Sequence, residues 1–148
     1  MRPRVETVFQ IMAADLMARV IPAIGSTYHQ GTIGMVAALF GIVSEEWDRA
    51  ASRRIEENDR LRELFRQSAP AVNDASLKAR ILELAETRDH DFHISALENN
   101  NCALRAALIE LHAHVEVQTS AEARKVEDAI WDELAKSTER RRLMSAQF

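Results

Sequence analysis

The sequence contains few of the residues that interrupt helices or cross-link a chain. It has three prolines and four glycines in 148 residues, so long uninterrupted helices are possible. Cys102 is the single cysteine and has no partner for an internal disulfide, which fits a reducing compartment. Aromatic residues make up only 5% of the chain and the net charge is −4, so the basic and aromatic surface typical of nucleic-acid binding is missing. We therefore expect no nucleic-acid partner.

Long hydrophobic runs are also missing. The longest covers residues 33–43, whereas a membrane-spanning helix needs about 20 apolar residues. Glu6 and Asp15 interrupt the segment where a secretory signal would have its apolar core. We therefore expect a cytoplasmic protein that does not act in a membrane. With 47% hydrophobic residues, the chain has enough for a core, and its length predicts one domain over residues 1–148.

Apolar residues recur at steps of three and four along most of the chain, which predicts helices and no strands. A first helix begins near Val5, and Pro22 should end or kink it near residues 18–21. A long second helix starts near Ser26 or Thr32 and extends to about Gln67. We therefore predict an all-α fold, an antiparallel helical bundle of four to five helices with one long second helix.

Local signals place the later helices. Asn73 or Asp74 is a candidate N-cap for the third helix, and the polar residues 88–91 fit either a turn or a continuous helix. Thr119 and Glu122 have the spacing of a capping box for the last helix. The fourth helix has the clearest pattern, a seam of coiled-coil type that consists of Leu97, Asn101, Leu104, Leu108, Leu111 and Val115.

Small residues form a stripe in the second helix at Gly31, Gly34, Ala38 and Gly41. Glycine inside a helix costs about 1 kcal/mol relative to alanine, and close approach of another backbone would compensate for this cost. We therefore expect such an approach at this stripe. Whether the helix continues through Gly41 stays open.

Asn101 interrupts the apolar seam, and two interpretations of it stay open. It either specifies register or oligomeric state, as a polar residue does in a coiled coil, or it lies at a wet edge of the bundle. A weak internal repeat also includes it: residues 58–65 and 101–108 both contain Asn, then Leu-Arg three residues later, then an apolar residue. A duplicated hairpin or a chance similarity explains this repeat.

Histidines provide the candidate metal ligands. His90 and His93 are three residues apart and would share one helix face, a spacing that can hold zinc or iron. His112 and His114 are two apart, so they would point to nearly opposite sides of a helix. The alternative for all of them is a surface or interface position beside carboxylates. The motif Glu-x-x-His does not occur, which argues against a ferritin-like di-iron site.

The doublet His90-Asp91 resembles the core of the HD-domain phosphohydrolases, an all-helical metal-dependent family. This resemblance implies that His90 and Asp91 are metal ligands, with His29 as the earlier histidine and Asp128 or Asp132 as the later aspartate. No nucleophile motif or phosphate-binding loop accompanies the doublet. The basic residues 140–142 lie near the end of the last helix, where positive charge complements the helix dipole, and this explains them.

A second resemblance involves Val20-Ile-Pro-Ala-Ile24, the helix that ends in Val43-Ser-Glu-Glu46, and the basic terminal helix containing Leu134. Residues 5–65 mainly carry it, and the chain resembles small bacterial all-helical proteins encoded beside acyl-CoA dehydrogenases and phosphotransferase-like proteins. The chain departs from this pattern because no Asn-Pro follows its last helix. The resemblance implies an accessory role and identifies no catalytic residue.

These observations predict a helical interaction module, without cofactor, that associates with itself to bury its excess apolar surface. The alternative is a metal-dependent hydrolase of HD-like type that uses His90 and Asp91, with His93 as a further candidate ligand. Of the two, a function other than catalysis agrees better with the absence of catalytic motifs.

Overall fold

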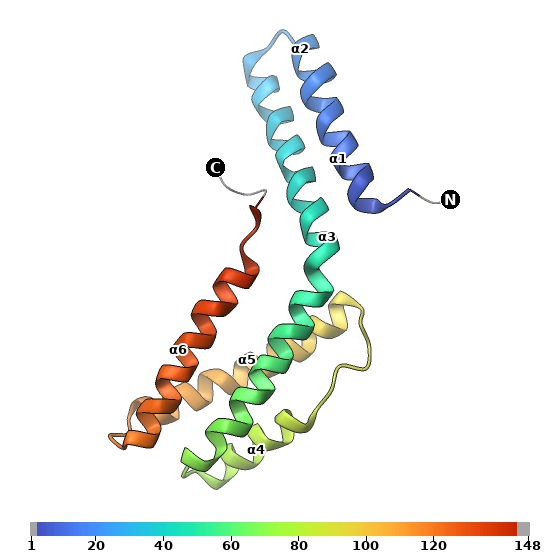
Figure 1. Cartoon of the computed structure of the whole chain (residues 1–148). Helices are drawn as coiled ribbons and strands as arrows, with labels where there is room; N and C mark the ends of the chain where they lie inside the picture. The colour runs from blue at the N-terminus through green and yellow to red at the C-terminus, as the bar shows by residue number, and fades with distance from the viewer. Residues whose placement is uncertain (1–2, 145–148) are drawn as a thin grey trace. The chain divides into compact units, whose positions relative to one another are not determined.

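A computed structural model describes residues 3–144 and confirms the all-α prediction, because no strand occurs in this range. No described helix combines the length and the apolar character needed to cross a membrane. The α-helices are α1 Val5–Asp15, α2 Ile21–Ala23, α3 Thr27–Ser68, α4 Ala75–Glu86, α5 Ile94–Glu116 and α6 Ala121–Arg141 (Figure 1). The long second helix is therefore confirmed as α3, and it continues through Gly41 without a break.

The chain divides into two compact units. Of the described residues, one unit contains 3–50 together with 142–144, and the other is Ala51–Arg141. Helix α3 contributes its N-terminal part to the first unit and its C-terminal part to the second. The expectation of one domain over residues 1–148 stays a prediction, and each unit is described by itself.

The first unit is a helical hairpin of α1 and residues 27–50 of α3. The Phe9 and Phe40 rings pack with their centroids 5.5 Å apart, and the Ser44 hydroxyl donates a hydrogen bond to the Glu6 carbonyl at 3.0 Å. Pro22 acts where the sequence predicts, because a π-helical turn, Leu16–Val20, precedes it. A proline cannot donate to the carbonyl four residues earlier, and a wider turn accommodates that missing bond.

The expected backbone approach at the glycine stripe is wrong for its first two glycines. A Cβ placed on Gly31 would meet nothing within 4 Å, and one on Gly34 would meet only the Ile21 Cδ1 at 3.9 Å. Gly31 therefore faces open space and Gly34 faces one side chain at ordinary contact distance, so no second backbone lies against either of them.

The second unit is a bundle of the C-terminal part of α3 with α4, α5 and α6, in which consecutive helices run antiparallel. Side-chain contacts connect neighbouring helices: Arg66 of α3 pairs with Glu86 at the end of α4, Arg80 of α4 pairs with Glu110 of α5, and Arg141 of α6 bonds to Asn101 of α5. Every apolar residue of the predicted α5 seam is buried. The largest buried side chains of the core are Phe65, Ile81, Leu104, Leu111 and Ile130.

Polar caps begin two of these helices. Asp74 caps α4 as predicted, and its carboxylate accepts a hydrogen bond from the Leu77 backbone N–H at 2.7 Å. The predicted capping box of Thr119 and Glu122 is wrong by one residue. The cap of α6 is Ser120, whose hydroxyl accepts from the Ala123 N–H at 3.1 Å, because only this residue stands three positions before that donor. Residues 87–93 form no helix.

We expect Phe65→Ala to lower the free energy of unfolding by about 3–5 kcal/mol, because its side chain is 0% exposed and its removal leaves a cavity. Chemical denaturation monitored by circular dichroism measures this change. Ile109→Ala is the matched control, because the Ile109 side chain is 70% exposed and its loss should change stability by less than about 0.5 kcal/mol. Equal effects of both substitutions would contradict this assignment of the core.

Candidate functional site

Glu57 is the centre of a polar network inside the second unit. Glu57 is 2% exposed, and the Arg141 guanidinium donates two hydrogen bonds of 2.7 Å each to its carboxylate. The Ser137 hydroxyl also donates to this carboxylate, and the Arg54 guanidinium lies 3.4 Å from it. Helix α3 thus supplies the carboxylate, and α6 supplies its two principal donors.

Two buried asparagines extend this network to α5. Asn101, 1% exposed, donates to the Asn58 side-chain oxygen at 3.0 Å and to Glu57 at 3.3 Å, and it accepts from Arg141 at 3.3 Å. The interpretation of Asn101 as a wet-edge residue is therefore wrong. Its partners lie on α3 and α6, so it connects α5 to both helices; the interpretation that it specifies register or oligomeric state stays a prediction.

A second ion pair continues the network toward the surface. Arg62 on α3 forms two hydrogen bonds to the Asp89 carboxylate, at 2.9 and 3.0 Å, and both side chains are only 4% exposed. Asp89 also accepts from Asn58 at 3.2 Å and from Asn100 at 2.7 Å. The non-helical segment 87–93 is thereby fixed against α3 through Asp89, the residue before the His90-Asp91 doublet.

Charge compensation determines how these groups titrate. Burial alone would raise the pKa of Glu57, but hydrogen bonds from Arg141 and Ser137 and the positive charges of Arg141 and Arg54 outweigh burial and lower it. The pKa of Asp89 is lowered in the same way, against its burial, by Arg62, Asn100 and Asn58. Burial would lower the pKa of Arg62, and the hydrogen bonds and charges of Asp89 and Asp59 raise it instead.

This network has no evident capacity for acid–base catalysis. A general base near neutral pH needs a raised carboxyl pKa and an accessible lone pair, whereas Glu57 and Asp89 have lowered pKa values and several donors each. The arrangement instead keeps two carboxylates ionised inside the bundle, so it acts as a structural element that connects α3, α5, α6 and the segment 87–93.

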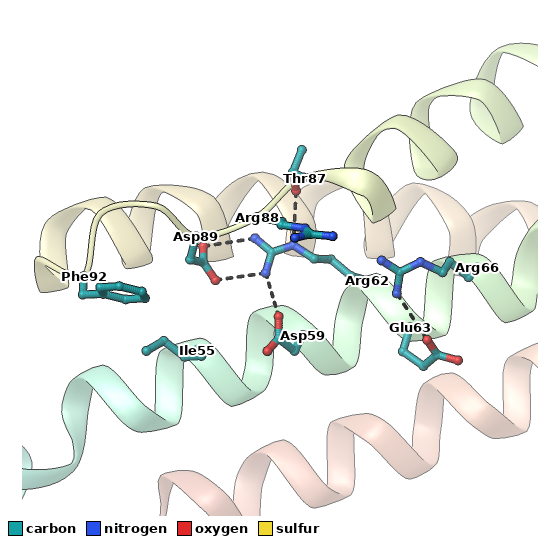
Figure 2. A pocket seen from close by; sticks show the side chains of 9 residues that line it. All are labelled: Ile55, Asp59, Arg62, Glu63, Arg66, Thr87, Arg88, Asp89 and Phe92. Atoms are coloured by element: carbon teal, nitrogen blue, oxygen red, sulfur yellow. Dashed lines mark hydrogen bonds and ion pairs between the residues drawn. The ribbon is translucent and has the colours of Figure 1, made fainter.

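A hollow of about 430 Å³ lies beside the Arg62–Asp89 pair, between α3 and the segment 87–93. Figure 2 shows Phe92 and Ile55 at one end of it, and Arg62, Arg88 and Arg66 further along. Its volume is within the range of small-molecule sites, about 300–1,000 Å³.

The predicted metal ligands lie outside this hollow. His90, Asp91 and His93 are exposed, and none of them lines it. Asp91 accepts from the His93 backbone N–H at 2.9 Å and contacts the His93 ring, and these bonds lower the pKa of Asp91. This pattern is a local turn before α5, of the kind that aspartate commonly forms.

The structure does not assemble further ligands around this turn. No group of three or more His, Cys, Asp or Glu residues that could hold a metal occurs within residues 3–144. His29 belongs to the first unit and His90 to the second, while Asp128 and Asp132 are exposed on α6. The metal site at His90, Asp91 and His93 therefore stays a prediction.

His112 and His114 occupy opposite sides of α5, as their spacing predicts. The His112 ring meets the Trp131 ring edge-on with centroids 5.2 Å apart, and it faces α6. His114 lines a separate hollow with Asp74 and Glu110, toward α4. Cys102, also on α5, is exposed.

The first unit presents a second candidate region. Tyr28, Met35, Leu39 and Val43 are exposed, and their spacing of four and seven residues places them on one face of α3, which we call the apolar stripe. Helix α1 has no buried residue, and Val8, Ile11 and Met12 are exposed on it; Met17 is exposed in the π-helical turn that follows. A surface of this kind is typical of an interaction site.

No family model matches this chain, and neither a curated protein nor a solved structure matches it. The resemblance to helical proteins encoded beside acyl-CoA dehydrogenases, and the resemblance of the His90-Asp91 doublet, therefore stay predictions. Function is inferred below from the geometry of the described residues.

Sequence reasoning missed most of the polar network, including Glu57, Arg62, Asp89 and Arg141. One signal pointed to part of it, the internal repeat that aligns Asn58 with Asn101. In the structure these two asparagines bond directly to each other, and Leu61 and Leu104 lie in one core. The repeat therefore marks two helices that face each other.

We expect Glu57→Gln to lower the free energy of unfolding by about 3 kcal/mol, because it leaves Arg141 beside an uncharged group in a buried site. The Arg141 side chain is partly exposed, so water offsets some of the loss. Glu56→Gln is the matched control: Glu56 is the exposed neighbour on α3, and its substitution should change stability by less than about 0.5 kcal/mol. Urea denaturation of both variants measures these changes. Similar urea midpoints for Glu57→Gln and Glu56→Gln would contradict a stabilising role of the network.

Acidification should destabilise the protein through the same carboxylates. In the unfolded chain Asp and Glu titrate near pH 3.9 and 4.3, and in the folded protein the pKa values of Asp89 and Glu57 are lower. The ionised forms therefore favour folding; their contribution is complete above about pH 5 and is lost as the pH falls through these values. Unfolding free energies measured from neutral to acidic pH should show this loss, and Asp89→Asn should make the curve shallower. An unchanged slope in Asp89→Asn would contradict the assignment.

Proposed function

We propose that the chain is a helical interaction module that associates with a second copy of itself through the first unit. The observation that carries this proposal is the exposed apolar stripe of Tyr28, Met35, Leu39 and Val43 on α3. The neighbouring α1 adds exposed apolar residues and buries none completely. Burying this surface would release about 25 cal/mol for each Å² of apolar area removed from water.

The sequence around the stripe favours a protein partner. Between Arg19 and Glu45 there is no Asp, Glu, Lys or Arg, so α3 meets its partner with a face free of formal charge. Removal of this face from water therefore requires no desolvation of a charged side chain. In this respect the uncharged face of α3 resembles the central part of an obligate protein–protein interface, where charged residues are depleted.

A second copy fits this surface for a geometric reason. A hairpin of two helices has one face without a partner, and two hairpins that pair by a two-fold axis form a four-helix bundle. Glu45 and Glu46 follow the stripe at one end only. Antiparallel pairing would place them beside the neutral Tyr28 end of the other copy, about 27 Å along α3 from Glu46, and so would avoid repulsion between like charges.

The polar network of the second unit supports a role other than catalysis, because its carboxylates are fully engaged. The hydrolase alternative at His90 and Asp91 has no three-ligand group within residues 3–144 to support it. An accessory role in the cytoplasm, with no cofactor and no nucleic-acid partner, completes the proposal.

Wild-type protein should be a dimer at micromolar concentration, and Leu39→Glu should weaken dimerisation by at least about a hundredfold, because it would bury a carboxylate near the proposed two-fold axis. Sedimentation equilibrium of the untagged full chain measures both. Leu39 is 52% exposed within one chain, so the variant monomer should keep its fold.

Ile109→Glu provides the matched control. It makes the same chemical change on an exposed apolar residue of α5, in the second unit, and should leave the dimer unchanged. A wild-type monomer at micromolar concentration would contradict the proposed self-association. Dimers that Leu39→Glu leaves intact would show that another surface mediates association.

A further inference from the structure

The hollow beside the Arg62–Asp89 pair has two chemically different ends. Phe92 and Ile55 supply apolar side chains at one end (Figure 2). The remainder is lined by polar residues, namely three arginines, Thr87 and the carboxylates Asp59, Glu63 and Asp89. Sites for small molecules combine these features, since an apolar wall provides affinity and a few polar groups fix orientation.

Two of the three arginines are already compensated. Arg62 is held by Asp89 and by Asp59, the latter at 3.0 Å. Arg66 pairs with Glu63 at 3.2 Å and with Glu86 at 3.4 Å, and it also donates to the Ala85 carbonyl. Neither guanidinium therefore has a free charge for a ligand.

Arg88 differs from both, because its side chain has no hydrogen-bond or ion-pair partner among the described residues. It follows Thr87, whose hydroxyl is occupied by Arg62 and by the Leu84 carbonyl. A guanidinium presents several N–H groups in a planar fork that matches a carboxylate or a phosphate. Arg88 is thus the arginine of the hollow without a carboxylate partner among the described residues, whereas the three lining carboxylates, Asp59, Glu63 and Asp89, pair with Arg62 or Arg66.

Phe92 is the second unusual feature. It is 61% exposed although it lies in a segment that Asp89 fixes to α3, and it stands at the hollow rather than in the core. The hollow therefore has an exposed aromatic ring at one end and an unpaired arginine further along, which provide a stacking surface and an anion donor within one site.

We propose that this hollow binds a small organic anion that carries an aromatic ring. The ring would pack against Phe92 and Ile55, and a carboxylate or phosphate would accept hydrogen bonds from Arg88. A volume of about 430 Å³ suits a molecule of this size. The site lies in the second unit, so the proposal is independent of dimerisation through the apolar stripe.

The test is a titration of isotope-labelled full-length protein by nuclear magnetic resonance, with phenyl phosphate and phenylacetate as probes. These two probes distinguish a phosphate from a carboxylate preference. Inorganic phosphate and acetate lack the ring, and benzyl alcohol lacks the charge. We expect at least one aromatic anion to saturate in the millimolar range or below, to shift the amides of residues 87–93, and to bind at least about tenfold more tightly than the three partial probes.

Two variants test the named residues. Arg88→Gln and Phe92→Ala should each raise the Kd of the bound probe about tenfold, through loss of the charged donor and of the stacking surface respectively. Both residues are exposed, so the variants should keep the wild-type fold, which thermal unfolding checks. Arg124→Gln on α6 removes an equal charge outside the hollow and should leave the Kd unchanged.

Three results would overturn the proposal. Neither aromatic anion saturates at millimolar concentration; the Kd is unchanged in Arg88→Gln or in Phe92→Ala; or a ring-free or uncharged probe binds as tightly as the aromatic anions. Equal weakening in Arg124→Gln would likewise show that net charge, and not this site, attracts the probe.

Discussion

The ion pair between Glu57 and Arg141 is the interaction on which the second unit depends. Taking a carboxylate out of water costs several kcal/mol, and this cost is offset only when donors surround it with good geometry. Arg141 and Ser137 from α6, Asn101 from α5 and Arg54 from α3 provide those donors. A shift of any of these helices by one turn would leave a buried charge unpaired. The pair therefore constrains the register of three helices at once, which apolar packing alone does with less specificity.

This constraint also determines where the protein has capacity to interact. The carboxylates and asparagines of the polar network bond to each other and to arginines, so the side chains available to other molecules lie outside this network, at two margins of the structure. One margin is the hollow where the Arg62–Asp89 pair fixes the segment 87–93 and leaves Arg88 and Phe92 exposed. The other is the first unit, whose two helices cannot enclose a core of their own. The two units thus differ in kind: the second buries its apolar residues internally, whereas the first exposes them.

The fold was largely predictable because its signals are local. Steps of three and four residues predict the helices, and the bounds of α3 and the buried seam of α5 follow from that period. Asp74 was predictable as a cap because it stands directly before a helical pattern. The errors have equally specific causes. Thr119 and Ser120 are both good caps, and only backbone geometry selects Ser120; the glycines at 31 and 34 fit close packing, but no second backbone lies against them.

The candidate sites were predictable only in part. The sequence by itself determined which residues form helices and which faces are apolar, because these properties depend on neighbours within about one or two turns. It also marked Asn58 and Asn101 as related positions. The tertiary structure alone decided that Glu57 and Arg141, separated by 84 positions, neutralise each other, and that Asp89 rather than the adjacent His90-Asp91 doublet is held inside. Whether a polar side chain is buried depends on partners brought together by packing, and no local pattern records those partners.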